Sequence, residues 1–259
     1  MTIRAPRWLR ALRQGPVAGF FLDLLLALLA MLALLLLAMT AWSLLHTARP
    51  ALGFNMDRDG SDLLAAVVAS TVSTGGAALL LYWWRRRASA AEIAASSASA
   101  LRLRTWAWAA ATGVATYLAS GSITALAQQL GIEPQPTNVA MIEATMVAHP
   151  IVLFVVAVVL APAYEELLFR RVLFGRLWSA GRPLLGLVLS SAVFALMHEL
   201  PGSGGNGIAA TAWLWLVYSA MGAAYAALYW HTRTLWAPIA AHALNNALAL
   251  GALKLYGGN

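Results

Sequence analysis

Long apolar runs alternate with short polar segments along most of this chain. A helix that crosses a bilayer needs roughly 20 mostly apolar residues. The runs predict seven such helices: three at about residues 17–46, 62–84 and 104–130, and four that begin near residues 150, 184, 208 and 235. Proline- and glycine-rich turns separate several of them, including the segment PGSGGNG. The pattern therefore predicts an all-α integral membrane protein.

The composition agrees with this class. Hydrophobic residues make up 61% of the 259 residues and charged residues 10%, whereas soluble domains have roughly 45–50% apolar and about 25% charged residues. The chain has no cysteine, which excludes disulfides and thiolate metal sites. Its net charge of +7 could indicate nucleic-acid binding, but basic residues beside membrane helices explain it equally well.

The positions of the basic residues favour the membrane explanation. If the N-terminus is cytoplasmic, the predicted inside segments contain every lysine and arginine except Arg49, Arg58 and Lys254. This asymmetry is typical of multi-pass proteins of the cell (inner) membrane. We therefore expect a cytoplasmic N-terminus, an outside C-terminus, the lipid bilayer as a partner and no nucleic acid. Asp23 is expected to pair with an arginine, and residues 88–100 to form a loop or a short interfacial helix.

Four charged residues interrupt the apolar run that begins near residue 150: Glu165, Glu166, Arg170 and Arg171. Ionisable groups inside a spanning helix are costly and usually mark a function. Glu166 and Arg170 are four residues apart, so they share a helix face and can pair. Glu165 is rotated by about 100° and can face a cavity as a general base or a ligand. The alternative is a purely structural ion cluster, and Arg171 is interpreted as a positive-inside residue.

A histidine in the next predicted helix can meet Glu165. His198 lies one turn after Phe194, and the turn between the two helices centres near residue 181. In an antiparallel hairpin, Glu165 and His198 are each about 16 residues from this turn and therefore level. The alternative for an isolated histidine on an apolar face is a structural role.

The last predicted helix contributes His242 and Asn246, which are four residues apart. Their N–H groups can together stabilise a developing oxyanion. The alternative is an asparagine that hydrogen-bonds across packed membrane helices. Counted from the preceding turn, His242 lies shallower than Glu165, so helix tilt or a non-helical entry before Pro238 is needed to bring the two to one depth.

Three spaced motifs follow one another along the chain, and together they resemble the pattern of the CAAX protease and bacteriocin-processing family of intramembrane endopeptidases. They are Glu165-Glu166-x-x-x-Arg170, Phe194-x-x-x-His198 and His242-x-x-x-Asn246. The resemblance covers about residues 150–250. It implies a protease core at residues 149–259 formed by the last four helices, preceded at residues 1–148 by three helices and an arginine-rich cytoplasmic loop.

The resemblance also implies an activity and a role for each motif residue. The activity is hydrolysis of a peptide bond in a membrane-associated protein or peptide. Glu165 activates water, His198 positions or shares that water, Glu166 and Arg170 support them, and His242 with Asn246 stabilises the oxyanion.

Two chemical arrangements fit the same residues. In the first, Glu165 and His198 activate water without a cofactor, which is the arrangement we expect. In the second, Glu165, His198 and His242 bind zinc and leave a position open for water. The chain has no His-Glu-x-x-His motif, and a zinc site would need Glu166 as a separate base although Arg170 competes for it.

Two functions other than proteolysis remain compatible with the residues. One is a non-proteolytic membrane scaffold or immunity protein with the same fold. The other is a proton-coupled transporter, in which the glutamates and histidines form a relay. A transporter typically has repeats or broken helices in both halves, whereas the polar residues here gather in the fourth, fifth and seventh predicted helices.

Overall fold

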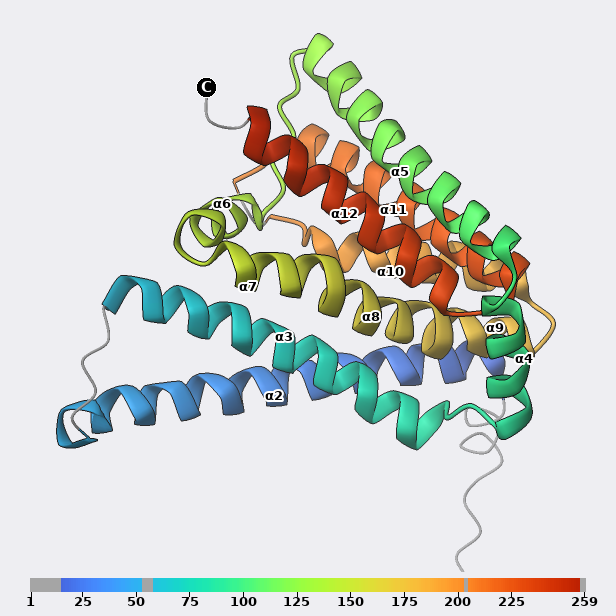
Figure 1. The fold of residues 1–259 in the computed structure, drawn as a ribbon, viewed down its shortest axis with the longest axis horizontal. Coiled ribbons are helices and arrows are strands. Elements are labelled where there is room, and N and C mark those ends of the chain that lie inside the picture. The colour runs from blue at the N-terminus through green and yellow to red at the C-terminus, as the bar shows by residue number, and fades with distance from the viewer. Residues whose placement is uncertain (1–14, 53–57, 203–204, 257–259) are drawn as a thin grey trace, which may run out of the picture.

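The computed structural model describes residues 15–52, 58–202 and 205–256, and the side chains at 49–52 and 58–61 are not part of that description. Arg4, Arg7, Arg10 and Arg13 of the predicted inside face lie outside the described residues. The described chain forms helices and no strand (Figure 1). They are α2 (Pro16–Leu52), α3 (Arg58–Arg85), α4 (Ala90–Ala100), α5 (Leu103–Gln129), α6 (Val139–Ala148), α7 (Pro150–Phe154), η1 (Val155–Leu160), α8 (Ala161–Glu166), η2 (Leu167–Phe174), α9 (Gly175–Ser179), α10 (Pro183–His198), α11 (Ile208–Thr232) and α12 (Trp236–Tyr256).

The helices confirm an all-α membrane protein. Each of the seven predicted helices has a counterpart, and the fourth is the continuous helix of 30 residues at Pro150–Ser179 that contains α7 to α9. Four helices are long and apolar enough to cross a membrane: Pro16–Ala48, Asp62–Arg85, Pro150–Ser179 and Ile208–Thr232. Helices α5, α10 and α12 are not among them, and α10 has only 16 residues. The count of seven spans therefore stays a prediction.

Two short helices refine the sequence interpretation. Helix α4 forms within the stretch 88–100, where Ser89 and Glu92 make a capping box and no residue is buried. Helix α6 was not predicted, because its ten residues are too few to stand out from the apolar run that follows. His149, with φ −141° and ψ 60°, separates α6 from α7, since the residue before a proline avoids the helical conformation.

The N-terminal helices pack on two sides of the later ones. The α2–α3 hairpin contacts η2, α8 and α9, while α5 contacts α11 and α12. The helix at Pro150–Ser179, called the irregular helix below because it contains η1 and η2, therefore lies with α10 to α12 between them (Figure 1). The division at residue 148 is not tested by this packing and stays a prediction.

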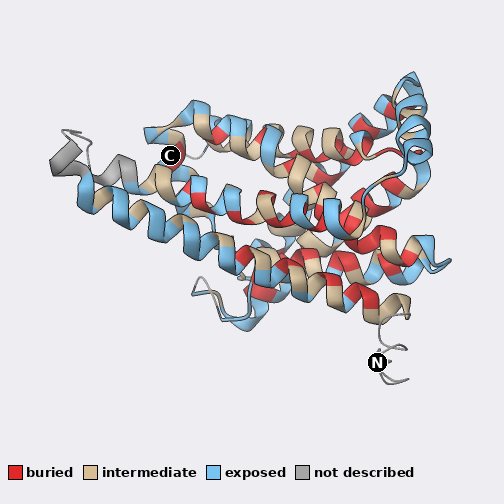
Figure 2. Cartoon of the chain, turned by 90° about the horizontal axis from the view of Figure 1, so that it is seen from below, coloured by how far each residue is buried: buried red, intermediate tan, exposed pale blue. Residues whose placement is uncertain are grey.

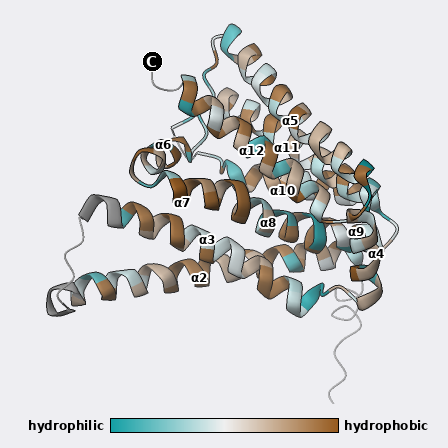
Figure 3. Cartoon of the chain, in the orientation of Figure 1, coloured by the Kyte–Doolittle hydropathy of each residue, from teal (hydrophilic) through white to brown (hydrophobic). Residues whose placement is uncertain are grey.

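The outer surface of the bundle is apolar. In the four candidate spans, only 22 to 39% of the residues in the most apolar window are buried. Exposed residues cover the outer faces in Figure 2, and in Figure 3 the same helices, α2 and α7 above all, are coloured as hydrophobic. Leu37 of α2, for example, is 66% exposed. An apolar surface of this extent is the pattern expected where lipid replaces water as the solvent.

Two glycines bring the helices around the candidate site close together. A Cβ atom at Gly113 of α5 would lie 2.7 Å from the backbone oxygen of Ala241 in α12. A Cβ atom at Gly222 of α11 would lie 3.0 Å from Cα of Ser191 in α10. Small residues allow such close packing of membrane helices, and here they bring α5 close to α12 and α11 close to α10.

Arginines hold the α2–α3 hairpin to the core at one end of the bundle. Asp23 is fully buried and pairs with Arg85 at 2.8 Å and with Arg176 of α9. The expected pairing of Asp23 with an arginine is thereby confirmed. Because breaking a buried ion pair leaves an uncompensated charge, this cluster fixes the hairpin against the helix that carries Glu165.

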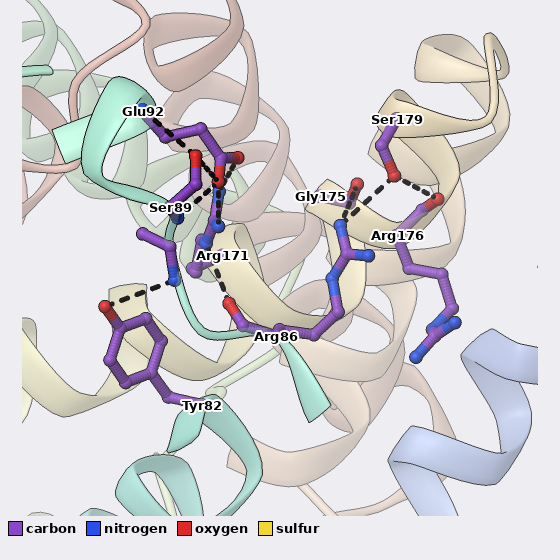
Figure 4. A network of polar contacts seen from close by, with 9 residues as sticks. Tyr82, Arg86, Ser89, Glu92, Arg171, Gly175, Arg176 and Ser179 are labelled. Carbon is purple, nitrogen blue, oxygen red and sulfur yellow. Dashed lines mark hydrogen bonds and ion pairs between the residues drawn. The ribbon is translucent and has the colours of Figure 1, made fainter. Parts of the chain in front are cut away.

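A second arginine network joins α4 to the same helix (Figure 4). Arg171 donates two hydrogen bonds to Glu92, at 2.8 and 3.0 Å, and a third to the backbone oxygen of Arg86. The guanidinium of Arg86 in turn contacts the backbone oxygen of Gly175 at 2.8 Å. The hydrogen bonds from Arg171, followed by that from the Ser89 backbone, lower the pKa of Glu92 to about 2. Arg171 is therefore a tether for α4 as well as a basic residue at this end.

Candidate active site

A local change of helix geometry precedes the two glutamates. Segment η1 is π-helical, and at its end the N–H of Ala161 donates to the oxygen of Val156, five residues back. The next bond in this register would join Pro162 to Ala157, but proline has no N–H. The freed oxygen of Ala157 accepts instead from Nδ2 of Asn246 at 2.9 Å. Pro162 thus creates the acceptor that ties α12 to the helix beside the glutamates.

Glu166, Arg170 and His242 form a buried charged cluster. Glu166 and Arg170 are fully buried, and the predicted pairing is present, with Arg170 Nε 2.7 Å from Glu166 Oε2. His242, which is 3% exposed, places Nδ1 3.0 Å from Glu166 Oε1. The guanidinium of Arg170 also lies 5.1 Å from the centre of the Phe194 ring and 5.7 Å from that of Tyr225. The ring centres of Phe194 and Tyr225 also lie 6.1 and 5.0 Å from that of His242, so Glu166 and two aromatic rings together fix the position of the histidine.

The contact with Glu166 decides which protons His242 can offer. Glu166 is held as a carboxylate by Arg170 and can only accept, so Nδ1 of His242 carries a proton. In the neutral ring, Nε2 then has a lone pair and is an acceptor. His242 can donate through Nε2 only as an imidazolium.

Glu165 and His198 face each other from the irregular helix and α10. Glu165 Oε2 lies 3.8 Å from His198 Nε2, and their side chains are 16 and 22% exposed. Glu165 and His198 therefore lie at the same depth, as their equal distances from the turn predicted. The ring of His198 stacks on Tyr218 at 4.5 Å between centres and lies 4.2 Å from Phe194. Unlike the Glu166 cluster, this pair is partly open to its surroundings.

The hydrogen bonds of His198 indicate what the pair can hold. Its Nδ1 lies 2.8 Å from the backbone oxygen of Phe194, which only accepts, so Nδ1 is protonated and Nε2 of the neutral ring carries a lone pair. Oε2 of Glu165 is buried and has no hydrogen-bond partner among the described residues. Two acceptors 3.8 Å apart do not bond to each other, but a water molecule can donate one proton to each. The lone pairs of that water would then be directed away from both acceptors.

The structure brings all six predicted site residues to one region, in two groups. Glu165 faces His198, whereas His242 joins Glu166 and Arg170. Counting residues from the turn placed His242 at a shallower depth than Glu165. Its contact with Glu166 shows that it nevertheless reaches the depth of the glutamates. Asn246 approaches the backbone at Ala157 and also accepts from Nδ2 of Asn245 at 3.1 Å.

The same geometry bears on the zinc alternative. Glu165, His198 and His242 are not collected into one set, because His242 is directed to Glu166. Over the described ranges, no three His, Cys, Asp or Glu side chains are grouped as ligands of a metal ion. The arrangement without a cofactor stays a prediction that only a measurement of metal dependence can test.

Two tyrosines belong to the site although the sequence interpretation did not select them. Tyr218 stacks on His198, and Tyr225 stacks on His242 with 5.0 Å between ring centres and 20° between planes. They are seven residues apart and therefore share one face of α11. The one signal in the sequence was this spacing inside an apolar helix, which is equally typical of ordinary core packing.

Comparisons with known proteins cover the region that contains these residues. Residues 147–248 match the model of the family described as "Type II CAAX prenyl endopeptidase Rce1-like". A protein of Bacillus subtilis (strain 168) described as "Putative membrane peptidase YdiL" is 30% identical over 120 residues, which is 46% of this chain and 44% of that relative. The chain thus spans less than half the length of this relative. No solved structure matches the chain.

Proposed function

We propose that this chain is an intramembrane endopeptidase that hydrolyses a peptide bond of a membrane-associated protein or peptide, because residues 147–248 match the type II CAAX prenyl endopeptidase family model and a relative is described as a putative membrane peptidase. The single observation that carries the proposal is the pair of acceptors, Glu165 Oε2 and His198 Nε2, which are 3.8 Å apart on two side chains that are 16 and 22% exposed. Peptide hydrolysis needs an activated water, a base for its proton and donors for the oxyanion. The pair provides the first two.

In the proposed reaction, a water held between Glu165 and His198 attacks the carbonyl carbon of the substrate. Its oxygen forms the new C–O bond, and Glu165 takes the proton that the water loses. The tetrahedral intermediate then collapses, the C–N bond breaks and Glu165 returns the proton to the leaving nitrogen. His198 keeps the water oriented through Nε2, while Tyr218 and the Phe194 carbonyl fix its ring.

The oxyanion of the intermediate is assigned to His242 and Asn246. For this role His242 must be an imidazolium that donates through Nε2, with Glu166 at Nδ1 balancing its charge. Asn246 has two N–H bonds, one of which is used on Ala157, so the second can serve the substrate. Glu166 and Arg170 act through His242 and are therefore positioning residues in this proposal.

The proposal is tested by substituting the water-binding pair. Purified protein in liposomes is incubated with a library of peptides that carry an apolar anchor, and cleavage is followed by mass spectrometry. Glu165→Ala and His198→Ala are expected to insert and fold but not to cleave, while Glu143→Ala, at an exposed glutamate of α6, keeps full activity. Full activity of either site variant contradicts the assignment. Absence of cleavage by the wild type under all conditions would favour the scaffold alternative.

A further inference from the structure

An open groove runs between α5 and α11, and none of the six predicted site residues lines it. It encloses about 540 Å³, within the ~300–1,000 Å³ that is usual for sites that bind small molecules. Its lining residues come from α5, among them Ala111, Ala115 and Ala119, and from α11, among them Met221, Leu228 and His231. Most of them are apolar, and many are alanines, so the two helices leave space between them.

The groove is open to the surroundings of the bundle. Ala111, Ala115 and Ala119 follow one another at four-residue spacing on α5, and all three are exposed. The floor is formed by buried residues of α11, among them Met221 and Leu228. In a membrane-spanning bundle such an opening faces hydrocarbon chains, so the material that fills it is an apolar chain and not water.

The groove ends at a basic and aromatic pocket. His231 lines the groove and also a smaller adjoining pocket with Ala227, Trp230 and Arg233. Arg233 is exposed, its guanidinium lies 6.0 Å from the centre of the Trp178 ring, and no described carboxylate forms an ion pair with it. The hydroxyl groups of Ser96 and Thr234 are 2.9 Å apart, which joins this turn to α4 and hence to the end of the bundle where Arg171 binds Glu92.

We propose that this groove is a binding site for one anionic phospholipid, with an acyl chain between α5 and α11 and the phosphate at His231 and Arg233. An apolar channel that ends in an unpaired arginine, a histidine and tryptophans has the polarity of such a lipid along its length. A zwitterionic lipid has a cationic group beside its phosphate and matches Arg233 less well. The site lies outside the proposed peptidase machinery and does not depend on the proposed function.

The test uses the full chain purified in a mild detergent with phosphatidylglycerol, phosphatidylcholine or inorganic phosphate added. Native mass spectrometry counts retained lipid, and the unfolding temperature reports binding, since a ligand of the folded state raises it. Phosphatidylglycerol is expected to bind with one tightly retained copy and to raise the unfolding temperature, whereas the other two have little effect. Ala115→Phe fills the groove and Arg233→Gln removes the charge, and each is expected to weaken binding at least tenfold.

Matched controls separate this site from lipid that coats the whole surface. Ala110→Phe changes an exposed alanine of α5 that does not line the groove, and Arg182→Gln removes an exposed arginine from another turn. Both are expected to bind phosphatidylglycerol like the wild type. Equal binding of phosphatidylcholine, an effect of inorganic phosphate alone, or unchanged binding by both Ala115→Phe and Arg233→Gln would each overturn the proposal. Arg233→Gln keeps this decision available if Ala115→Phe does not fold.

Discussion

Replacing Arg170 by methionine should destabilise the protein far more than the same change at its neighbour Arg171. Arg170 and Glu166 are both fully buried, so removing the guanidinium leaves a carboxylate that only His242 can compensate. Breaking a buried pair by removing one partner costs about 3–5 kcal/mol. Methionine retains an apolar stem against Phe194, so the loss reports the charge and not the packed volume.

The control is the same substitution at the adjacent arginine. Arg171 pairs with Glu92, whose side chain is 52% exposed, and such a pair contributes roughly 0.2–1 kcal/mol. The hydrogen bond from Arg171 to the backbone oxygen of Arg86 adds about 0.5–1.5 kcal/mol, so the total stays below the loss expected at Arg170. The free energy of unfolding of each variant is measured by titration with a denaturing detergent and followed by tryptophan fluorescence. Adding Glu166→Gln to Arg170→Met should recover part of the loss, because it neutralises the orphaned carboxylate. Equal, small losses for Arg170→Met and Arg171→Met would refute the view that this pair is desolvated.

Three further outcomes follow from other contacts. Asn246→Ala should cost about 1–3 kcal/mol of unfolding free energy because it leaves the backbone carbonyl of Ala157 unpaired. The cost should be smaller in a Pro162→Ala background, because the new N–H can reach that carbonyl, and additive losses in the double-mutant cycle would contradict this expectation. Tyr218→Leu should lower kcat of the proposed peptidase by about 10–100-fold through loss of ring alignment, with KM little changed, while Tyr218→Phe stays close to the wild type; a loss confined to KM would show that the ring binds substrate instead. A spin label at Ala94→Cys, the sole cysteine of that variant, should become more mobile as the pH falls from about 4.5 toward about 2, because protonation of Glu92, whose pKa is lowered, releases α4 in this window. Glu92→Gln should show the mobile spectrum already at neutral pH. A spectrum that changes neither with pH nor in Glu92→Gln would exclude the tether.

The helices and the main pairings could be predicted because they follow from local rules. Apolar run length predicted the long helices, and the four-residue spacing of Glu166 and Arg170 predicted their contact. Equal distances from one turn placed Glu165 opposite His198. Each of these inferences needs only the rise and period of a helix.

The remaining features depend on how separate helices pack. The contact of His242 with Glu166 is set by how α12 packs against the irregular helix, and no spacing in the sequence specifies it. The partner of Asn246 depends on a π-helical register interrupted by Pro162, which looks like an ordinary proline in an apolar run. Helix α6 and the tether from Arg171 to Glu92 likewise join segments whose proximity the chain order does not reveal.

The most direct test of the central claim, that Glu165 and His198 activate a water for peptide hydrolysis, is cleavage in water enriched in oxygen-18. Protein in liposomes is incubated with the anchored peptide library, with and without a chelator, and the new C-terminal carboxylates are analysed by mass spectrometry. The account predicts that the wild type and Glu143→Gln incorporate oxygen-18 equally, with or without the chelator. Glu165→Gln, which preserves the shape of the side chain but cannot act as a base, should form no labelled product. Labelled product from Glu165→Gln at the rate of the wild type would contradict the account.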